Sequence, residues 1–129
     1  MKIQQSAEDY LESILVLGMS KPYVRSIDVA NDLGFSKPSV SVAMKNLREN
    51  GYISMSPEGH ITLLEPGARI AKNIYERHTT ISGLLTAMGV PEKIAADDAC
   101  RIEHVISPET FDALKEAYRK VTDRDLKND

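Results

Sequence analysis

The chain has 129 residues, a formal net charge of −3, 42% hydrophobic residues and no tryptophan. This length fits one ordinary domain or two small ones, and the acidic balance excludes a generally basic nucleic-acid coat protein, so any DNA contact must come from a local patch. The single cysteine cannot form an internal disulfide, and the first residues lack the apolar run of a signal peptide or membrane span. We therefore expect a cytoplasmic protein without membrane association, whose modest core favours a homo-oligomer.

The first predicted element is a helix over residues 6–18. Ser6 is a candidate N-cap, apolar residues recur at helical spacing, and Gly18 is a candidate end. Asp9 and Glu12 lie three residues apart and so share one flank of this helix. Capping can explain Asp9, because an acid three residues after a serine is itself a capping arrangement. A solvated face is the alternative explanation for Glu12.

Two short helices joined at Gly34 are predicted from residue 26 onward. Ser26 can cap the first helix, and Ser36 can cap the second, which has Pro38 in its first turn. This is the layout of a helix-turn-helix, in which the second helix reads DNA. Its buried stripe is expected to be Val40, Met44 and Leu47.

A short hairpin is predicted over residues 52–63, where two apolar runs flank the turn-forming residues 57–59. Helix, helix and hairpin in this order form a winged helix-turn-helix. Residues 21–52 carry five Lys or Arg against three acids, so this part of the acidic chain is locally positive. A solvated helix face would look similar, but together these features favour DNA binding. The candidate DNA contacts are Arg25, Ser36, Lys37, Pro38, Ser39, Ser41 and Lys45.

The remaining sequence predicts three helices. A long one opens at Gly67 and runs to Gly89, the next starts at Pro91 and carries residues 100–104, and Ser107 caps the third. The predicted fold is therefore mainly α, with a winged helix-turn-helix domain at residues 1–66 and a helical domain at residues 67–129.

Cys100, Glu103 and His104 stand at positions i, i+3 and i+4, which share one face of a helix. Thiol, carboxylate and imidazole can all bind a transition metal, although a buried structural cysteine fits the same spacing. An enzyme is not expected, because no orienting third group, phosphate loop or H-E-x-x-H motif is found. The alternative to a metal site is a redox- or ligand-responsive regulator that acts through Cys100 without bound metal.

Four stretches, "AEDYLESI", "SKPSVSVAMKNLRENGYI", "YERHTTISGLL" and "ACRIEHVIS", give the chain a family resemblance from residue 7 to about residue 107. In their order and spacing they resemble the diphtheria toxin repressor family of metal-dependent transcription regulators. The resemblance implies an N-terminal winged helix domain, a C-terminal helical dimerisation domain and a divalent metal between them. The protein would then be a homodimeric repressor of metal-homeostasis genes on a palindromic DNA operator. We expect the short form of the family, without the SH3-like domain of longer members.

The resemblance also implies metal ligands. Manganese-type members have an Asp, a Glu and a His at the positions of Asp9, Glu12 and His78, and both branches have Glu and His where Glu103 and His104 stand. Iron-type members have a methionine in place of Asp9 and a cysteine at the position of Cys100. This chain therefore follows the manganese branch at one position and the iron branch at the other.

The ancillary metal site of iron-type members is expected to be absent in its usual form, because two of its ligand positions hold Ser82 and Ala96. For the main site, a thiolate from Cys100 favours softer ions, whereas carboxylates suit Mn(II). Metal–thiolate bonding discriminates more sharply between these ions, so we expect activation by Fe(II), with Mn(II) as a weaker activator. Zn(II), Co(II) and Ni(II) are expected to bind in vitro.

Overall fold

The protein divides into two compact units in a computed structural model that describes residues 5–128, with the side chains of residues 5–123. Unit 1 is Met1–Asn73 and unit 2 is Ile74–Asp129. The division falls inside one helix, α4 (Glu65–Ala87), whose first turns belong to unit 1 and whose remainder belongs to unit 2. No helix in the described range is long and apolar enough to cross a membrane.

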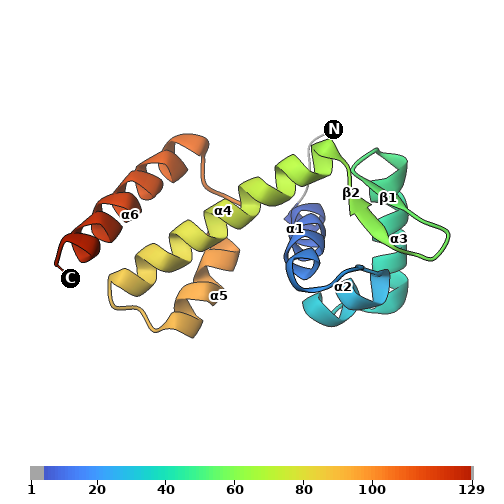
Figure 1. The fold of residues 1–129 in the computed structure, drawn as a ribbon, viewed down its shortest axis with the longest axis horizontal. Helices are drawn as coiled ribbons and strands as arrows, with labels where there is room; N and C mark the ends of the chain where they lie inside the picture. The colour runs from blue at the N-terminus through green and yellow to red at the C-terminus, as the bar shows by residue number, and fades with distance from the viewer. Residues whose placement is uncertain (1–4, 129) are drawn as a thin grey trace. The chain divides into compact units, whose positions relative to one another are not determined.

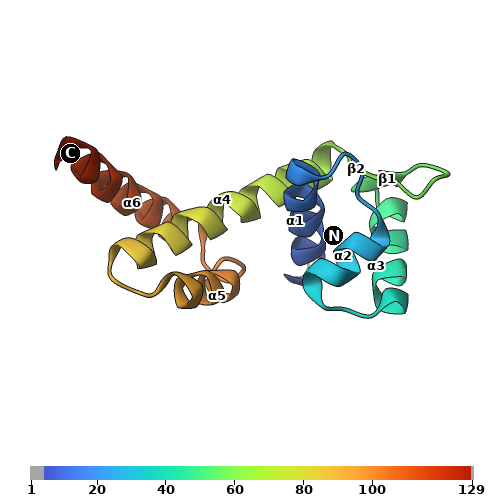
Figure 2. The same ribbon diagram turned by 60° about the horizontal axis from the view of Figure 1, so that its bottom comes forward.

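Unit 1 is a winged helix-turn-helix, as the sequence predicted. Its elements are α1 (Gln5–Ser20), α2 (Ser26–Leu33), α3 (Lys37–Glu49), β1 (Ile53–Met55) and β2 (Ile61–Leu63). α2 contacts both α1 and α3, and the strands follow α3 as a hairpin (Figures 1 and 2). The core of the unit is aliphatic, and its most buried members are Leu11, Val29, Val40, Met44 and Ile53.

The helix boundaries of unit 1 follow local chemistry. α2 ends at Gly34, whose φ of 71° is readily adopted by glycine, and the Ser36 hydroxyl accepts a hydrogen bond from the Ser39 N–H at 3.3 Å. Both predictions are confirmed. The predicted cap of α2 is wrong by one residue, because the N-cap is Arg25, whose N–H donates to the Asp28 carboxylate at 2.9 Å.

The predicted limits of α1 are also wrong. The helix already includes Gln5, so Ser6 is not its N-cap, and it continues past Gly18 to Ser20. The Lys21 N–H still donates to the Leu17 carbonyl at 2.9 Å, which shows that the helical hydrogen bonding passes through the glycine. A glycine in a helix lowers its stability but does not by itself end it.

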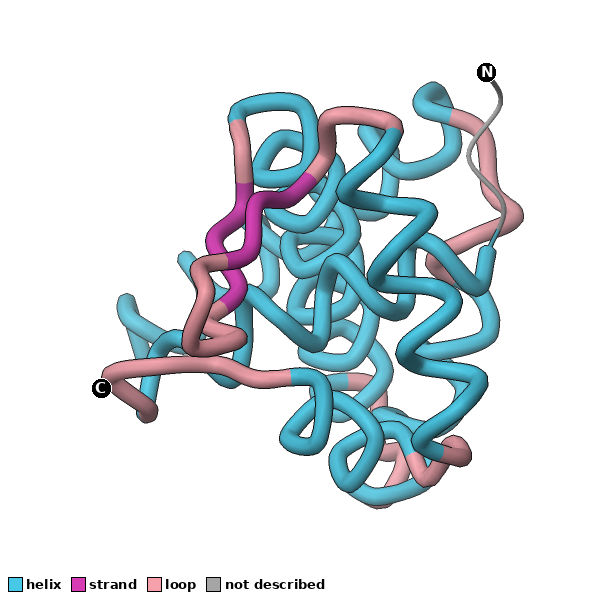
Figure 3. Tube along the Cα trace, turned by 90° about the vertical axis from the view of Figure 1, so that its right-hand side faces the viewer, coloured by secondary structure: helices cyan, strands magenta, loops and turns pink. Residues whose placement is uncertain are grey.

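The wing is a two-stranded antiparallel sheet in which Ile53 pairs with Leu63, Ser54 with Thr62 and Met55 with Ile61. Figure 3 shows the two strands side by side. Gly59 has a φ of 82° in the turn between them. The Ile61 N–H also donates to the Val24 carbonyl at 2.8 Å, which ties the wing to the segment before α2.

Gly67 does not open α4 as the sequence analysis expected, because the helix begins at Glu65. The glycine is required by close packing: a Cβ atom at residue 67 would overlap the carbonyl oxygen of Tyr52 and come within 3.3 Å of the Leu11 side chain. Its role is thus to let the first turn of α4 approach the chain that leads into the wing.

Unit 2 consists of the second part of α4 with α5 (Glu92–Ile102) and α6 (Pro108–Asn128). α5 and α6 flank this part of α4 (Figure 1), and a Cβ atom at Gly83 would lie 2.7 Å from the Tyr118 ring of α6. The predicted cap of α6 is confirmed, because the Ser107 hydroxyl accepts from the Thr110 N–H at 3.1 Å. α5 ends at Ile102, however, so Glu103 and His104 lie beyond the helix that was expected to carry them.

Candidate metal centre and DNA-binding face

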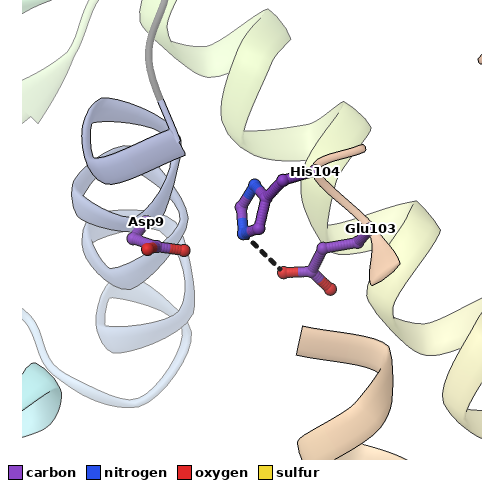
Figure 4. Close-up of side chains that lie close together, drawn as sticks. All are labelled: Asp9, Glu103 and His104. Atoms are coloured by element: carbon purple, nitrogen blue, oxygen red, sulfur yellow. Dashed lines mark ion pairs between the residues drawn. The ribbon is translucent and has the colours of Figure 1, made fainter. Parts of the chain in front are cut away.

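Glu103 lies at the centre of a cluster of possible metal ligands in unit 2. It directly follows α5, and its side chain has no exposed surface. One carboxylate oxygen, Oε2, is 2.9 Å from Nδ1 of His78 on α4. The other oxygen, Oε1, is 3.4 Å from Nε2 of His104, whose side chain is 1% exposed (Figure 4). The fold therefore brings a buried carboxylate between two imidazoles that stand 26 residues apart in the sequence.

This cluster fits a divalent transition metal. Among the described residues, no hydrogen bond reaches Glu103 Oε1, although the atom is buried. A buried carboxylate is costly unless it is paired, hydrogen-bonded or bound to a metal. Carboxylate oxygen and imidazole nitrogen are ligands that Fe(II), Mn(II) and Zn(II) accept. The incomplete hydrogen bonding of Glu103 is therefore explained if a cation binds at this carboxylate.

Arg77 holds the segment that carries Glu103 and His104. Its Nη1 donates to the Glu103 carbonyl at 3.1 Å and to the Ile106 carbonyl at 2.9 Å. The guanidinium also lies over the Phe111 ring of α6, 5.2 Å from its centroid. The carbonyls at the end of a helix lack intrahelical donors. Here the guanidinium of Arg77, on α4, donates to them. Sequence reasoning missed Arg77, because its partners are backbone atoms 26 and 29 residues away.

The other three predicted ligands stand on α5 and α1. Cys100 is exposed on α5, whereas Glu103, the C-cap residue of that helix, is buried. Asp9 and Glu12 are half-buried on α1 in unit 1. Of the six predicted ligands, His78, Glu103 and His104 are joined by contacts within unit 2.

The candidate DNA-binding face lies on α3. The helix buries Val40, Met44 and Leu47, as predicted, and leaves its opposite side exposed. A hollow of about 210 Å³, lined by Ser26, Ile27, Lys37 and Ser41, separates the first turns of α2 and α3. Every predicted DNA contact is exposed, namely Arg25, Ser36, Lys37, Pro38, Ser39, Ser41 and Lys45. Positive and hydroxyl side chains on an exposed helix suit contacts with phosphates and base edges.

Arg25 is linked to the wing. Its Nη2 is 3.3 Å from Nε2 of His60, and the His60 ring stacks on Tyr23 with the ring centroids 4.1 Å apart. No local sequence pattern predicts this contact, because His60 lies 35 residues after Arg25. The contact places one predicted DNA-binding residue at the junction between the helix-turn-helix and the wing.

Two family models together match nearly the whole chain. One describes the N-terminal DNA-binding domain of iron-dependent repressors and matches residues 2–61. The other describes the metal-binding and dimerisation domain of the same proteins and matches residues 64–125.

Individual relatives agree with these matches. The chain is 35% identical over 124 residues to an uncharacterized HTH-type transcriptional regulator of Methanocaldococcus jannaschii, covering 95% of this chain and 99% of that protein. It is 37% identical over 107 residues to the transcriptional regulator MntR of Salmonella typhimurium, and the match covers 83% of this chain and 68% of that protein. The solved structure of a manganese-dependent transcriptional repressor in complex with manganese superimposes with a TM-score of 0.80 at 25% identity. That match covers 87% of this chain but 52% of the solved one, so the chain spans about half of its length.

Proposed function

Because the chain belongs to the iron-dependent repressor family of metal-dependent transcription regulators, we propose that it is a homodimeric repressor that a divalent metal activates to bind a palindromic DNA operator. Its regulated genes would be those of metal homeostasis, and its place of action the cytoplasm. The family consists of transcription regulators, which are not enzymes. The observation that carries the proposal is the buried Glu103 carboxylate between His78 and His104.

We infer that His78, Glu103 and His104 bind the metal from unit 2 and that Asp9 and Glu12 add carboxylates from α1. The two acids stand one turn apart and match ligand positions of the manganese-type relatives. Ligands from both units on one ion would restrict the units to one relative arrangement. Of the arrangements open to the apo protein, metal binding would thus select those in which the two α3 helices of a dimer fit successive major-groove sites. Because metal ligands must be deprotonated, activation should weaken as the pH falls.

Metal removal is the direct test of this function. The full-length protein is titrated against duplexes that it selects from a random DNA pool, with added Fe(II) under anaerobic conditions and then with excess chelator. Chelation is expected to weaken binding by roughly 10- to 100-fold, the usual size of an allosteric coupling. Restored binding after Fe(II) is returned would support the proposal. Equal affinity with and without chelator would contradict it.

A second candidate function is a regulator that senses oxidants through Cys100 without metal, and the exposure of this thiol favours it. The same binding assay separates the two functions. A metal-free redox regulator should ignore the chelator and respond to peroxide, and Cys100→Ser should remove that response. A metal-activated repressor should still respond to the chelator when residue 100 is serine, although it should need more metal for activation if Cys100 is a ligand.

We propose Fe(II) as the physiological metal, with Mn(II) as a weaker activator. This step adds Cys100 as a sixth ligand to the five named above, since a thiolate favours softer ions than carboxylates do. If the thiolate sets the preference, Cys100→Glu should shift activation toward Mn(II) and make DNA binding less sensitive to oxidation. DNA affinity measured against free Fe(II) and Mn(II) for both proteins checks this. A preference for Mn(II) in the wild type, or no shift in the variant, would exclude Cys100 as the selecting ligand.

A further inference from the structure

Val42 is an apolar residue in the middle of the exposed face of α3. Its side chain is 60% exposed, whereas Val40 and Met44, two residues before and after it, are buried. Residues two apart on a helix point about 200° apart, so Val42 faces away from the core of unit 1. The residues one turn before and one turn after it on the exposed side are Pro38 and Lys45.

The fold of unit 1 does not explain a valine at this position. The side chain gains little from burial, and a β-branched residue has a lower helix propensity than the straight-chain polar residues usual on such a surface. Single exposed apolar residues are common on proteins. Val42, however, lies on the surface that the proposed function places in the major groove, among exposed hydroxyl and amine groups. If α3 enters the major groove as proposed, base edges would surround this side chain in the DNA complex.

We propose that Val42 contacts the C5-methyl group of a thymine in each operator half-site and thereby specifies an A·T pair there. The proposal rests on the proposed DNA-binding function. The thymine methyl is the apolar group that a base pair presents in the major groove, and small apolar side chains recognise it by contact. Pro38 stands four residues earlier and is also exposed, so the two residues form a short apolar strip on the otherwise polar exposed side of α3. Hydroxyls and lysines on the same helix can supply the polar contacts on either side of this strip.

Removing the methyl group from DNA tests the contact without changing base pairing. A duplex is first selected from a random pool by the metal-loaded wild-type protein, and each thymine is then replaced in turn by deoxyuridine. We expect one position per half-site at which wild-type affinity falls roughly fourfold, the worth of one buried methyl group. Replacement in both half-sites should cost roughly 15-fold, because well-separated positions are additive. For the Val42→Ser variant, the same deoxyuridine replacement should leave the DNA affinity unchanged.

Two controls make the result specific. Val16→Ser changes an exposed valine on α1 of the same unit and should keep the wild-type response to deoxyuridine. Val42→Thr keeps one methyl group of the side chain and should retain part of that response. The inference would be overturned if the wild-type protein tolerates every deoxyuridine, or if the Val42→Ser variant keeps the same sensitive position. Either result would leave the proposed function unaffected. A pool that yields no enriched sequence would overturn the proposed function and this inference together.

Discussion

Glu103→Gln is expected to remove metal-dependent DNA binding while leaving the dimer folded. The substitution keeps the size and shape of the side chain but removes the negative charge, which is the property that a divalent cation requires. His78 and His104 would remain, so the variant loses one ligand of the inferred site. Metal affinity measured by calorimetry should fall by two orders of magnitude or more, and DNA affinity with metal should drop to the level of the chelated wild type.

The stability of the apo protein, unlike its metal affinity, should not fall in the Glu103→Gln variant. Glu103 has no exposed surface, and its Oε1 accepts no hydrogen bond from the described residues. A neutral amide avoids the cost of a buried charge, so without metal the free energy of unfolding should stay the same or rise by up to about 2 kcal/mol. With metal at a hundred times its dissociation constant the wild type should gain about 2.7 kcal/mol, and the variant should not. Denaturant melts with and without metal measure both effects.

Glu76→Gln is the matched control. Glu76 lies on the same helix as His78 and pairs with Lys115, but it is half-exposed and is not an inferred ligand. Its replacement should leave metal and DNA affinity unchanged. If Glu103→Gln instead unfolds the apo protein, then Glu103 serves the structure of unit 2 through its histidine contacts, and the metal assignment fails.

Unit 1 was predictable from sequence because its signals are local. The N-cap Ser36, the glycine at the end of α2 and the three-residue and four-residue spacing of the buried stripe each depend on residues within one or two helical turns. Gly67 shows where such reasoning stops. Glycine is common at helix termini, which suggested a terminus here. The neighbours of Gly67 are Tyr52 and Leu11, and no local sequence pattern predicts that these residues lie close to it.

In unit 2, the spacing of residues 100, 103 and 104 predicted a shared helix face, and α5 ends before that face is complete. The proline at 108 disfavours a helical conformation for Ser107, so the chain must leave the helix before it. At the point where it leaves, Arg77 donates to the carbonyls of Glu103 and Ile106. The carboxylate of Glu103 and the imidazole of His104 were thus predicted as ligands from their chemistry. Their position could not be predicted, because the contact with Arg77 forms only in the folded protein.

Arg77→Ala is therefore expected to weaken metal binding although Arg77 is not a ligand. Two charge-assisted hydrogen bonds are lost, each worth about 1.5 to 3 kcal/mol, and the segment that carries Glu103 and His104 loses its attachment to α4. Residues that orient metal ligands typically cost about 10- to 100-fold in metal affinity when they are removed. Calorimetry gives that affinity, and amide hydrogen exchange should show faster exchange at residues 103–106 in the apo variant than in the wild type.

Two further variants separate positioning from general stability. Arg119→Ala removes another arginine of unit 2 that has two partners, Glu116 and Asp123, but all three are exposed, so metal affinity should not change. Arg77→Lys keeps the positive charge but replaces the planar guanidinium, whose Nη1 donates to both carbonyls, by an ammonium group on a stem of different shape, so it should restore only part of the affinity. If Arg77→Ala binds metal as tightly as the wild type, the 103–106 segment is held by other contacts and Arg77 has no positioning role. Full recovery by lysine would instead show that charge alone, and not the geometry of the guanidinium, holds the ligands in place.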